Sequence, residues 1–249
     1  MSTTTTTSSL AFTSLGLKQD LVSNLSSLGY EQMTPIQAKT LPEMIKGKDV
    51  IGEGQTGSGK TAAFGLALLN NLEVKRFRIQ SLVICPTREL ADQVAKELRK
   101  LARGIHNIKI LTLCGGTPFG PQIGSLEHGA HIIVGTPGRL EEHVIKGTLS
   151  LEYVDLLVLD EADRMLEMGF QAALDNIVRR TPLDRQTLLF SATFPEQIKS
   201  ISESIMTDPI MVKVASSENK STISQKFFKI THDEDRLDAL RLLLLETQV

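Results

Sequence analysis

The sequence predicts an α/β domain in which helices cover both faces of a mostly parallel β-sheet. Two observations support this fold class. Short, continuously apolar runs, typical of strands buried on both faces, alternate along the chain with segments of helical periodicity. In addition, a glycine-rich loop directly follows the first apolar run and precedes a helical segment, as in strand–loop–helix units that bind phosphate. Because ligands of such sheets bind beyond the carboxyl ends of the strands, the chemistry is expected at that edge.

The expected elements follow one another in a regular order. Runs rich in Val, Ile and Leu are the expected strands, at residues 50–51, 82–85, 108–113, 132–134, 156–159, 187–190 and 210–214. Apolar residues recur at helical spacing at residues 15–28, 34–45, 61–72, 88–101, 138–146, 170–180 and 195–206. Gly29 and Gly47 mark the ends of the first two helices, and Thr34-Pro35 marks the start of the second.

The two ends of the chain differ from the domain between them. Residues 1–11 are rich in Thr and Ser, without the basic start or apolar segment of a signal peptide, and are expected to be a disordered tail. Residues 12–214 form the expected domain, and the polar residues 215–222 read as a linker. Within residues 223–249, residues 223–230 alternate like a strand and residues 233–246 read as a helix. Because two such elements cannot bury a core alone, they are expected to be the truncated start of a second domain.

The composition limits the classes of protein. The 249 residues, of which 41% are hydrophobic, suffice for one large α/β domain and part of a second. The net charge of -2 means that a nucleic-acid partner needs a local basic patch, and a chain with no Trp and two Tyr has few platforms for stacking bases. Cys85 and Cys114 each end an apolar run, which favours buried thiols in a reducing compartment. The histidines show no metal-ligand spacing. We therefore expect a cytoplasmic protein with no membrane span and no protein-ligated structural metal.

One segment matches the phosphate-binding pattern G-x-x-x-x-G-K-[ST] in full: Gly54-Gln55-Thr56-Gly57-Ser58-Gly59-Lys60-Thr61. Its glycines allow the backbone to approach phosphate oxygens closely, and the following helix presents unpaired N–H groups to an anion. Lys60 is then placed to reach the β- and γ-phosphates, and the hydroxyl of Thr61 to hold Mg²⁺. The alternative is a glycine-rich turn followed by a chance Lys-Thr, which the flanking strand and helix disfavour. The segment predicts binding of a nucleoside triphosphate with Mg²⁺.

Acidic residues follow a later apolar run. Asp160 comes directly after residues 156–159, where a Mg²⁺-holding carboxylate is expected downstream of a phosphate loop. Its neighbour Glu161 is placed to orient and deprotonate the water that attacks the γ-phosphate. Alternatively, Asp160 caps the helix that begins near Arg164. The presence of the phosphate loop favours the metal-holding role.

These motifs occur together in one family. Asp160-Glu161-Ala162-Asp163, with the glycine loop upstream, resembles the signature of the DEAD-box ATP-dependent RNA helicases. Gly29-Tyr30 and Thr34-Pro35-Ile36-Gln37 look like the Q motif with which that family reads adenine, with Phe12 as its upstream aromatic residue. The resemblance covers residues 12–249 in the family's order. It implies a RecA-like P-loop NTPase domain, ATP and Mg²⁺ as cofactors, RNA as partner, and catalytic roles for Lys60, Asp160 and Glu161.

Further segments are similar to the motifs that grip RNA or couple hydrolysis to unwinding. The implied RNA contacts are Pro86, Thr87, Arg88, Gly115, Gly116, Thr136, Pro137, Gly138 and Arg139. Hydroxyls, backbone N–H groups and arginine charge read phosphate and 2′-OH groups, which gives sequence-independent binding to a strand. Ser191-Ala192-Thr193 is like the coupling motif, which the resemblance links to Asp163.

Several of these residues have a structural alternative. Gln37 can pair with adenine as donor and acceptor, but Thr34-x-x-Gln37 is also a capping box with Pro35 at the first helical position. Tyr30 can stack on a base or pack as part of a helix staple. Residues 136–139 are also a helix start, which itself attracts phosphate.

Two other groups of residues have simpler explanations. Ser191 and Thr193 either connect the acidic motif to its neighbouring strand or form a plain strand-end turn. Basic side chains of the helix at residues 88–101 and just beyond it are expected on a solvated face: Arg99, Lys100 and Arg103.

Within the family, residues 90–103 and 113–120 look most like a bacterial branch associated with large-subunit ribosomal RNA and ribosome assembly. Gly54 departs from the family's usual alanine but still fits the general phosphate-loop pattern. The family's second core domain carries arginine fingers and half of the RNA track, and these motifs do not occur in this sequence. We therefore expect the 249-residue chain to bind nucleotide but hydrolyse it near background and unwind nothing.

Two other functions are compatible with parts of this pattern. One is a non-catalytic truncated module that holds nucleotide or RNA. The other is a kinase built on the same phosphate loop, which would need an acceptor site that the sequence does not show.

Overall fold

The structure is a computed structural model that describes residues 11–214, 226–230 and 232–246. The chain divides into two compact units, Met1–Ala215 and Ser216–Val249. The expected linker, most of the expected tail and the start of the expected strand at 223–230 lie outside the described residues. Ala11, expected in the tail, instead pairs with Gln32 in an isolated antiparallel bridge.

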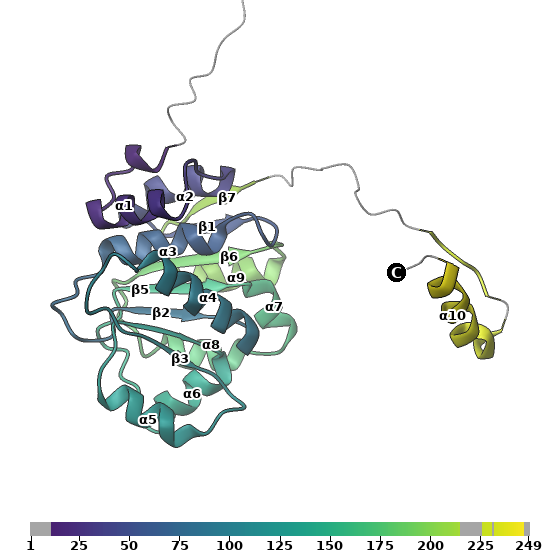
Figure 1. Ribbon diagram of the computed structural model, residues 1–249. Helices are drawn as coiled ribbons and strands as arrows, with labels where there is room; N and C mark the ends of the chain where they lie inside the picture. Colours follow the sequence, from purple (N-terminus) through teal and green to yellow (C-terminus); the bar gives the residue numbers. More distant parts are fainter. Residues whose placement is uncertain (1–10, 215–225, 231, 247–249) are drawn as a thin grey trace, which may run out of the picture. The chain divides into compact units, whose positions relative to one another are not determined.

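Within the described residues of the first unit, seven strands form one parallel sheet (Figure 1). They are β1 (Val50–Glu53), β2 (Ser81–Ile84), β3 (Ile110–Leu113), β4 (Ile132–Gly135), β5 (Leu156–Asp160), β6 (Gln186–Ser191) and β7 (Ile210–Lys213). Their order in space is β3-β4-β2-β5-β6-β1-β7. The predicted parallel α/β class is confirmed, and each predicted strand of this unit is present.

Two helices precede β1, and the other helices of this unit lie between the strands in sequence. They are α1 (Gln19–Ser27), α2 (Pro35–Ile45), α3 (Lys60–Asn71), α4 (Arg88–Leu101), α5 (Phe119–Glu127), α6 (Pro137–Ile145), α7 (Ala162–Glu167), α8 (Gln171–Val178) and α9 (Glu196–Ile205). The sequence does not predict α5, because two glycines and a proline within it disfavour a helix in isolation. Tertiary hydrogen bonds from the side chains of Gln122 and Lys109 hold it in place.

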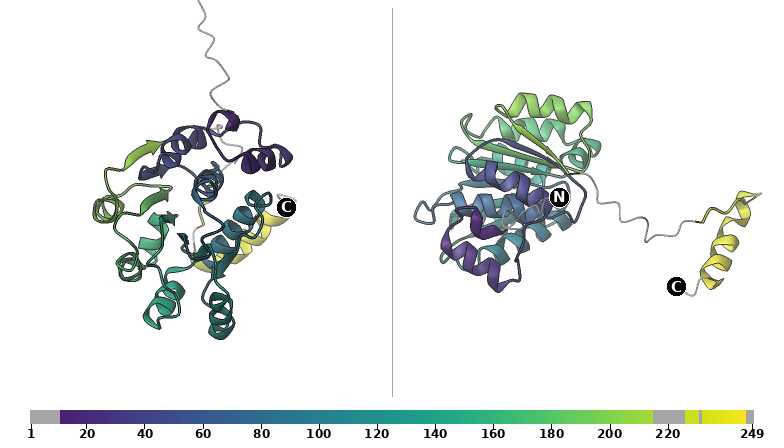
Figure 2. Two further views of the ribbon diagram at one scale, coloured as in Figure 1. Left: turned by 90° about the vertical axis from the view of Figure 1, so that its left-hand side faces the viewer. Right: turned by 90° about the horizontal axis from the view of Figure 1, so that it is seen from above.

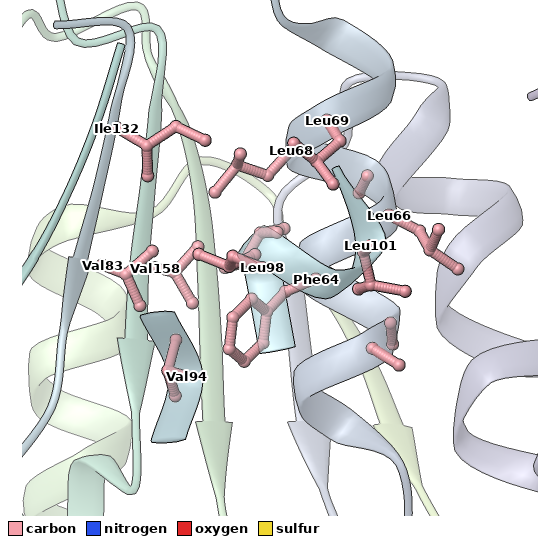
Figure 3. Close-up of a cluster of buried hydrophobic side chains, with 14 of the residues drawn as sticks. Phe64, Leu66, Leu68, Leu69, Val83, Val94, Leu98, Leu101, Ile132 and Val158 are labelled. Carbon is pink, nitrogen blue, oxygen red and sulfur yellow. The ribbon is translucent and has the colours of Figure 1, made fainter. Parts of the chain in front are cut away.

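Side chains at alternate strand positions enter two separate cores, as the two-residue period of a strand requires. Val83 of β2 belongs to the core shared with α1–α4, whereas its neighbour Leu82 belongs to the core shared with α6–α9. Figure 3 shows Phe64 of α3 and Leu98 of α4 in the first of these cores. Helices therefore cover both faces of the sheet, as Figures 1 and 2 show.

The second unit contains η3 (Asp233–Asp235) and α10 (Arg236–Glu246). Residues 226–230, the described part of the strand expected at 223–230, are not in a strand. A strand needs a neighbour for its backbone hydrogen bonds, and the described residues of this unit supply none. More than half of the surface is exposed for five leucines of α10: Leu237, Leu240, Leu242, Leu244 and Leu245. Among all described helices, none combines the length and apolar character needed to cross a membrane.

Candidate nucleotide and nucleic-acid site

Six motif-bearing loops meet at one edge of the sheet, because parallel strands end on the same side. The strand order sorts these loops into two neighbouring groups. Adjacent strands β5, β6 and β1 lead into the acidic motif, residues 191–193 and the glycine loop. Adjacent strands β3, β4 and β2 lead into Gly115-Gly116, residues 136–139 and residues 86–88. The sequence-predicted residues are thus divided into a nucleotide side and a second side.

The glycine loop leads from β1 into α3, and its backbone requires glycine at two positions. Gly57 and Gly59 have φ angles of +83° and +95°, which residues with a Cβ rarely adopt. A Cβ on Gly59 would also lie 2.6 Å from Nε2 of Gln37. Beside them, Oγ of Ser58 is buried and has no hydrogen-bond partner in the described structure. The loop therefore offers close backbone approach and an unused hydroxyl.

Lys60, the first residue of α3, turns back into this loop. Its ammonium donates hydrogen bonds to the carbonyl oxygens of Gly54 and Gln55, the latter at 3.0 Å. Burial lowers the pKa of Lys60, and the charges of Asp160 and Glu161 oppose that shift. A buried ammonium satisfied only by backbone carbonyls can exchange them for the stronger, charge-assisted bonds of an anion.

Gln37 lies at the start of α2 and contacts the glycine loop. Its Oε1 accepts the backbone N–H of Thr34 at 2.9 Å, and its Nε2 donates to the carbonyl of Gly59 at 3.1 Å. Oγ1 of Thr34 faces the Gln37 backbone as in a capping box but makes no hydrogen bond of normal geometry. The helix-capping alternative for Gln37 is therefore present. The same contacts hold its amide against the loop.

Tyr30 precedes α2 and is held by α4. Its hydroxyl donates to Oε1 of Glu97 at 2.7 Å, and the ammonium of Lys100 lies 5.2 Å from its ring centroid. Phe12 packs edge-on against it, with the ring centroids 6.3 Å apart. These contacts fix the Tyr30 ring beside the nucleotide-side loops.

Asp160 ends β5, and Glu161 is the residue directly before α7. Asp160 is 3% exposed, and burial raises its pKa to about 6, although the charge of Lys60 opposes the shift. Glu161 has a φ of +52°, in the left-handed region. Such strain at a residue other than glycine is a feature of functional sites. Its carboxylate lies 3.5 Å from Nη1 of Arg164.

Asp163, the last residue of the acidic motif, connects the segment after β5 to the end of β6. Its Oδ2 accepts hydrogen bonds from the backbone N–H and the hydroxyl of Thr193, at 3.0 and 2.9 Å. The backbone N–H of Asp163 also donates to Oγ of Ser191 at 3.4 Å. Burial would raise the pKa of Asp163, but the hydrogen bonds from Thr193 and Ser191 outweigh it and lower the pKa. Residues 191–193 are thus bonded to the acidic motif rather than forming only a strand-end turn.

A pocket of about 460 Å³ joins the nucleotide-side residues, within the usual size range of small-molecule sites. The predicted residues in its wall are Tyr30, Gln37, Thr56, Gly57, Gly59, Lys60, Thr61, Asp160 and Glu161. The sequence interpretation missed the opposite wall, which α4 supplies through Leu90, Gln93, Val94 and Glu97. Their spacing of three and four residues places them on one face of the helix. The polar residues among them, Gln93 and Glu97, were missed because polar residues on a helix ordinarily face solvent.

On the second side, backbone groups and short side chains predominate. Thr87 caps α4, its Oγ1 accepting the N–H of Leu90 at 3.3 Å. Oγ1 of Thr136 accepts the N–H of Gly115 at 3.4 Å and so joins the loops after β3 and β4. Gly116 has a φ of +74° and lies against the guanidinium of Arg88, whose side chain is 53% exposed.

Arg139 is engaged within the protein. Its Nη2 donates to the carbonyl of Thr117 at 3.0 Å, and its Nε lies 3.2 Å from the carboxylate of Glu142. The Arg139 side chain is 11% exposed, so in this arrangement its guanidinium holds the loop after β3. Arg88 is the more available charge. The basic residues expected on a solvated helix face are exposed: Arg99, Lys100 and Arg103.

Comparisons with known proteins agree with this arrangement. A family profile described as DEAD/DEAH box helicase matches residues 34–201. The chain belongs to the DEAD/DEAH box helicase family. The predicted family resemblance is therefore confirmed.

Individual relatives are bacterial helicases. The chain is 54% identical over 223 residues to the ATP-dependent RNA helicase DbpA of Escherichia coli (strain K12), covering 90% of this chain and 49% of that protein. It is 44% identical over 233 residues to the ATP-dependent RNA helicase CshA of Listeria monocytogenes serovar 1/2a, covering 94% of this chain and 45% of the relative. The chain thus spans about half the length of these relatives.

A solved structure has the same fold. The crystal structure of a DEAD box protein from the hyperthermophile Methanococcus jannaschii matches with a TM-score of 0.80 and 36% sequence identity. The match covers 94% of this chain and 63% of that one. The RecA-like fold expected from the resemblance is therefore confirmed.

Proposed function

We propose that this chain is the ATP-binding core domain of an ATP-dependent RNA helicase. The observation that carries the proposal is the sorting of the loops. The glycine loop, Lys60 and the acidic motif surround one pocket, and the backbone-rich loops after β3, β4 and β2 lie directly beside it. A nucleotide and a nucleic-acid strand would therefore occupy neighbouring parts of a single edge.

The residues of the pocket suit a nucleoside triphosphate. Buried hydroxyls of Ser58 and Thr34 lack partners in the described structure, and a Cβ on Gly59 would intrude on Gln37. We assign the phosphates to the backbone of residues 54–61 and to Lys60. The adenine is assigned to Gln37, with Tyr30 stacking on its ring. To bind adenine, the Gln37 amide has to replace its hydrogen bond to the carbonyl of Gly59 with a hydrogen bond to the base.

The acidic end of the pocket suits Mg²⁺ and water. The described residues hold no group of three or more His, Cys, Asp or Glu arranged for a metal ion, so ligands must come from few side chains. We assign Mg²⁺ to Thr61 and Asp160 together with phosphate oxygens, the hard oxygen donors that this ion prefers. The ion would neutralise phosphate charge. Glu161 would accept the proton of the attacking water, while Lys60 stabilises the charge on the phosphate oxygens.

The second side suits an RNA backbone. No atom lies within 4 Å of a Cβ built on Gly115 or Gly138, so a strand can approach the main chain there. We assign phosphate and 2′-OH contacts to Pro86, Thr87, Arg88, Gly115, Gly116, Thr136, Pro137, Gly138 and Arg139. Backbone N–H groups, hydroxyls and arginine charge bind phosphate and 2′-OH groups, which favours sequence-independent binding.

Hydrolysis and strand separation would be coupled through Asp163, Ser191, Ala192 and Thr193, because their hydrogen bonds join the acidic motif to β6. We further propose that residues 223–249 begin a second core domain that completes the ATP site. The exposed leucines of α10 are the apolar surface that such a domain would bury.

The cellular role follows from the relatives by analogy. The relative that shares 54% identity is named DbpA, and we propose ribosomal RNA as substrate, ribosome (large-subunit) assembly as process and the cytoplasm as location. These assignments rest on similarity to DbpA, of which this chain covers about half the length.

Two titrations test the proposal. Mg·ADP is expected to raise the melting temperature of the chain, since a ligand that binds only the folded state stabilises it. A fluorescent single-stranded RNA is expected to bind more tightly than single-stranded DNA of the same sequence, because the assigned groups read the 2′-OH. An unmoved melting temperature would refute the nucleotide site, and equal binding of RNA and DNA would refute the RNA assignment.

A further inference from the structure

The tip of the loop after β3 carries no side chain with which to fix its shape. Gly115 and Gly116 form its tip, and Gly116 adopts a positive φ. A glycine tip is free to approach a strand but costs more conformational entropy to order. Its position must therefore come from neighbouring side chains.

Gln122 of α5 binds this loop through two hydrogen bonds. Its Nε2 donates to the carbonyl of Cys114 at 3.0 Å and to Oγ1 of Thr117 at 2.6 Å, so it binds the loop on both sides of the glycines. Oγ1 of Thr117 in turn donates to the carbonyl of Cys114 at 3.0 Å. With both amide hydrogens used, the Gln122 side chain has one orientation, in which Oε1 points away from the loop.

His143 of α6 forms a hydrogen bond with Oε1 of Gln122. Its Nε2 lies 3.0 Å from Oε1 of Gln122, and because an amide oxygen only accepts, this nitrogen carries the proton. Nδ1 of the neutral ring then accepts, and the Thr148 hydroxyl shares its single hydrogen between Nδ1, at 2.8 Å, and the carbonyl of His143, at 3.2 Å. The imidazole is fully buried and stacks on Phe119 at 4.1 Å between ring centroids. Burial lowers the pKa of His143, and nearby Arg139 and Lys146 lower it further against the charge of Glu142, so the neutral ring is favoured.

We propose that Gln122 and His143 are positioning residues that set the Gly115-Gly116 loop for the phosphate backbone of an RNA strand. The inference rests on the proposed function, since it assumes that this loop binds RNA. Neither side chain touches the RNA. His143 fixes the Gln122 amide, and the amide fixes the carbonyl and hydroxyl that bracket the loop. Thr136 and Arg139 bind the same loop, Thr136 at the N–H of Gly115 and Arg139 at the carbonyl of Thr117, and Gln122 adds the contacts to Cys114 and to the Thr117 hydroxyl.

Three substitutions separate this role from general packing. His143→Leu removes both ring hydrogen bonds, whereas His143→Gln retains an amide donor near the position of Nε2. Gln122→Glu keeps the shape of the side chain but loses the donor to the Cys114 carbonyl. Each variant is measured for binding of fluorescein-labelled oligouridylate, for binding of a fluorescent ADP with Mg²⁺, and for amide hydrogen exchange of residues 113–118.

His143→Leu and Gln122→Glu are expected to weaken RNA binding about fivefold to tenfold, the scale of one or two lost hydrogen bonds, and to speed exchange at residues 113–118. His143→Gln is expected to stay within about twofold of the parent chain, a shift smaller than one hydrogen bond produces. Nucleotide affinity is expected to stay constant throughout, because residues 113–118, Gln122 and His143 are not part of the pocket wall.

Unchanged RNA affinity in both His143→Leu and Gln122→Glu would overturn the inference and leave RNA binding intact. A parallel loss of RNA and nucleotide affinity would overturn it too, since that pattern reports damaged folding. If the parent chain bound no RNA, the proposed function would fail and the inference with it.

Discussion

The hydroxyl of Tyr30 donates a 2.7 Å hydrogen bond to Oε1 of Glu97, joining the segment before α2 to the middle of α4. Burial raises the pKa of Tyr30 to about 12, and the bond to Glu97 and its charge act in the same direction. Both residues line the nucleotide pocket. The bond therefore joins two lining residues of the pocket that come from different elements, one of them the Tyr30 to which adenine stacking is assigned.

Substitutions at Tyr30 separate the ring from the hydroxyl. Tyr30→Phe is expected to lower the free energy of unfolding by about 1 kcal/mol, through loss of one hydrogen bond, and to change ADP affinity little. Tyr30→Ala is expected to reduce ADP affinity about tenfold, because it removes the stacking surface. Chemical denaturation and fluorescent-ADP titration measure the two effects. Tyr153→Phe, at the opposite edge of the sheet before β5, is the matched control. Equal ADP affinity for Tyr30→Ala and the parent would contradict the stacking role.

Lys60 is expected to be indispensable for nucleotide binding. In the structure the Lys60 ammonium binds the carbonyls of Gly54 and Gln55, and on nucleotide binding it would bind the phosphates instead. Lys60→Ala removes this ammonium. Binding of Mg·ADP is expected to fall at least about a hundredfold, given the strength of charge-assisted bonds to phosphate. Isothermal titration calorimetry measures the loss, with the exposed Lys199→Ala as control. ADP affinity that survives in Lys60→Ala would remove the basis of the site.

The raised pKa of Asp160 predicts a pH-dependent stability of the protein without nucleotide or Mg²⁺. Its pKa is about 6 in the fold and 3.8 in the reference state, so the folded protein binds this proton more tightly. Stability from this group is therefore present below pH 3.8 and is lost as the pH rises through 6. Asp160→Asn is expected to stabilise the protein by about 1–3 kcal/mol at pH 8, and by less at pH 5.

Denaturant unfolding in a chelating buffer at both pH values checks this prediction. The exposed Asp184→Asn serves as control, since it alters a carboxylate without changing a buried one. A stabilisation by Asp160→Asn that is larger at pH 5 than at pH 8 would contradict the assigned direction of the shift.

Glu161 is expected to act in turnover rather than in binding. In a protein that carries both core domains, Glu161→Gln is expected to keep ATP affinity within about twofold and reduce phosphate release by about a hundredfold or more, the contribution of a general base. Single-turnover phosphate release and nucleotide titration separate the two steps. The exposed Glu167→Gln, at the other end of α7, is the control. Loss of ATP binding in Glu161→Gln would assign this residue to binding instead.

Most strands and the nucleotide motifs are predictable because their signals are local. The glycine loop, Lys60 and the run before Asp160 identify themselves by residue type and spacing alone. Helix α5 escaped prediction because its glycines and proline oppose a helix, which is stabilised by contacts with distant residues. Gln93 and Glu97 escaped because a polar stripe on an amphipathic helix ordinarily marks solvent. Only the packing of Tyr30 and the glycine loop across from them creates a pocket.

The sequence by itself determined which segments become strands and helices and which loops carry chemistry. It did so because buried strands, helix starts and phosphate loops each depend on a few neighbouring residues. Only the tertiary structure decided which loops become neighbours. The chain runs from β1 to β7, but the sheet places β3, β4 and β2 together and β5, β6 and β1 together. The pairing of parallel strands depends on contacts between residues far apart in the chain. A local sequence pattern therefore cannot predict that one group of loops surrounds a nucleotide pocket and that the other group lies beside it.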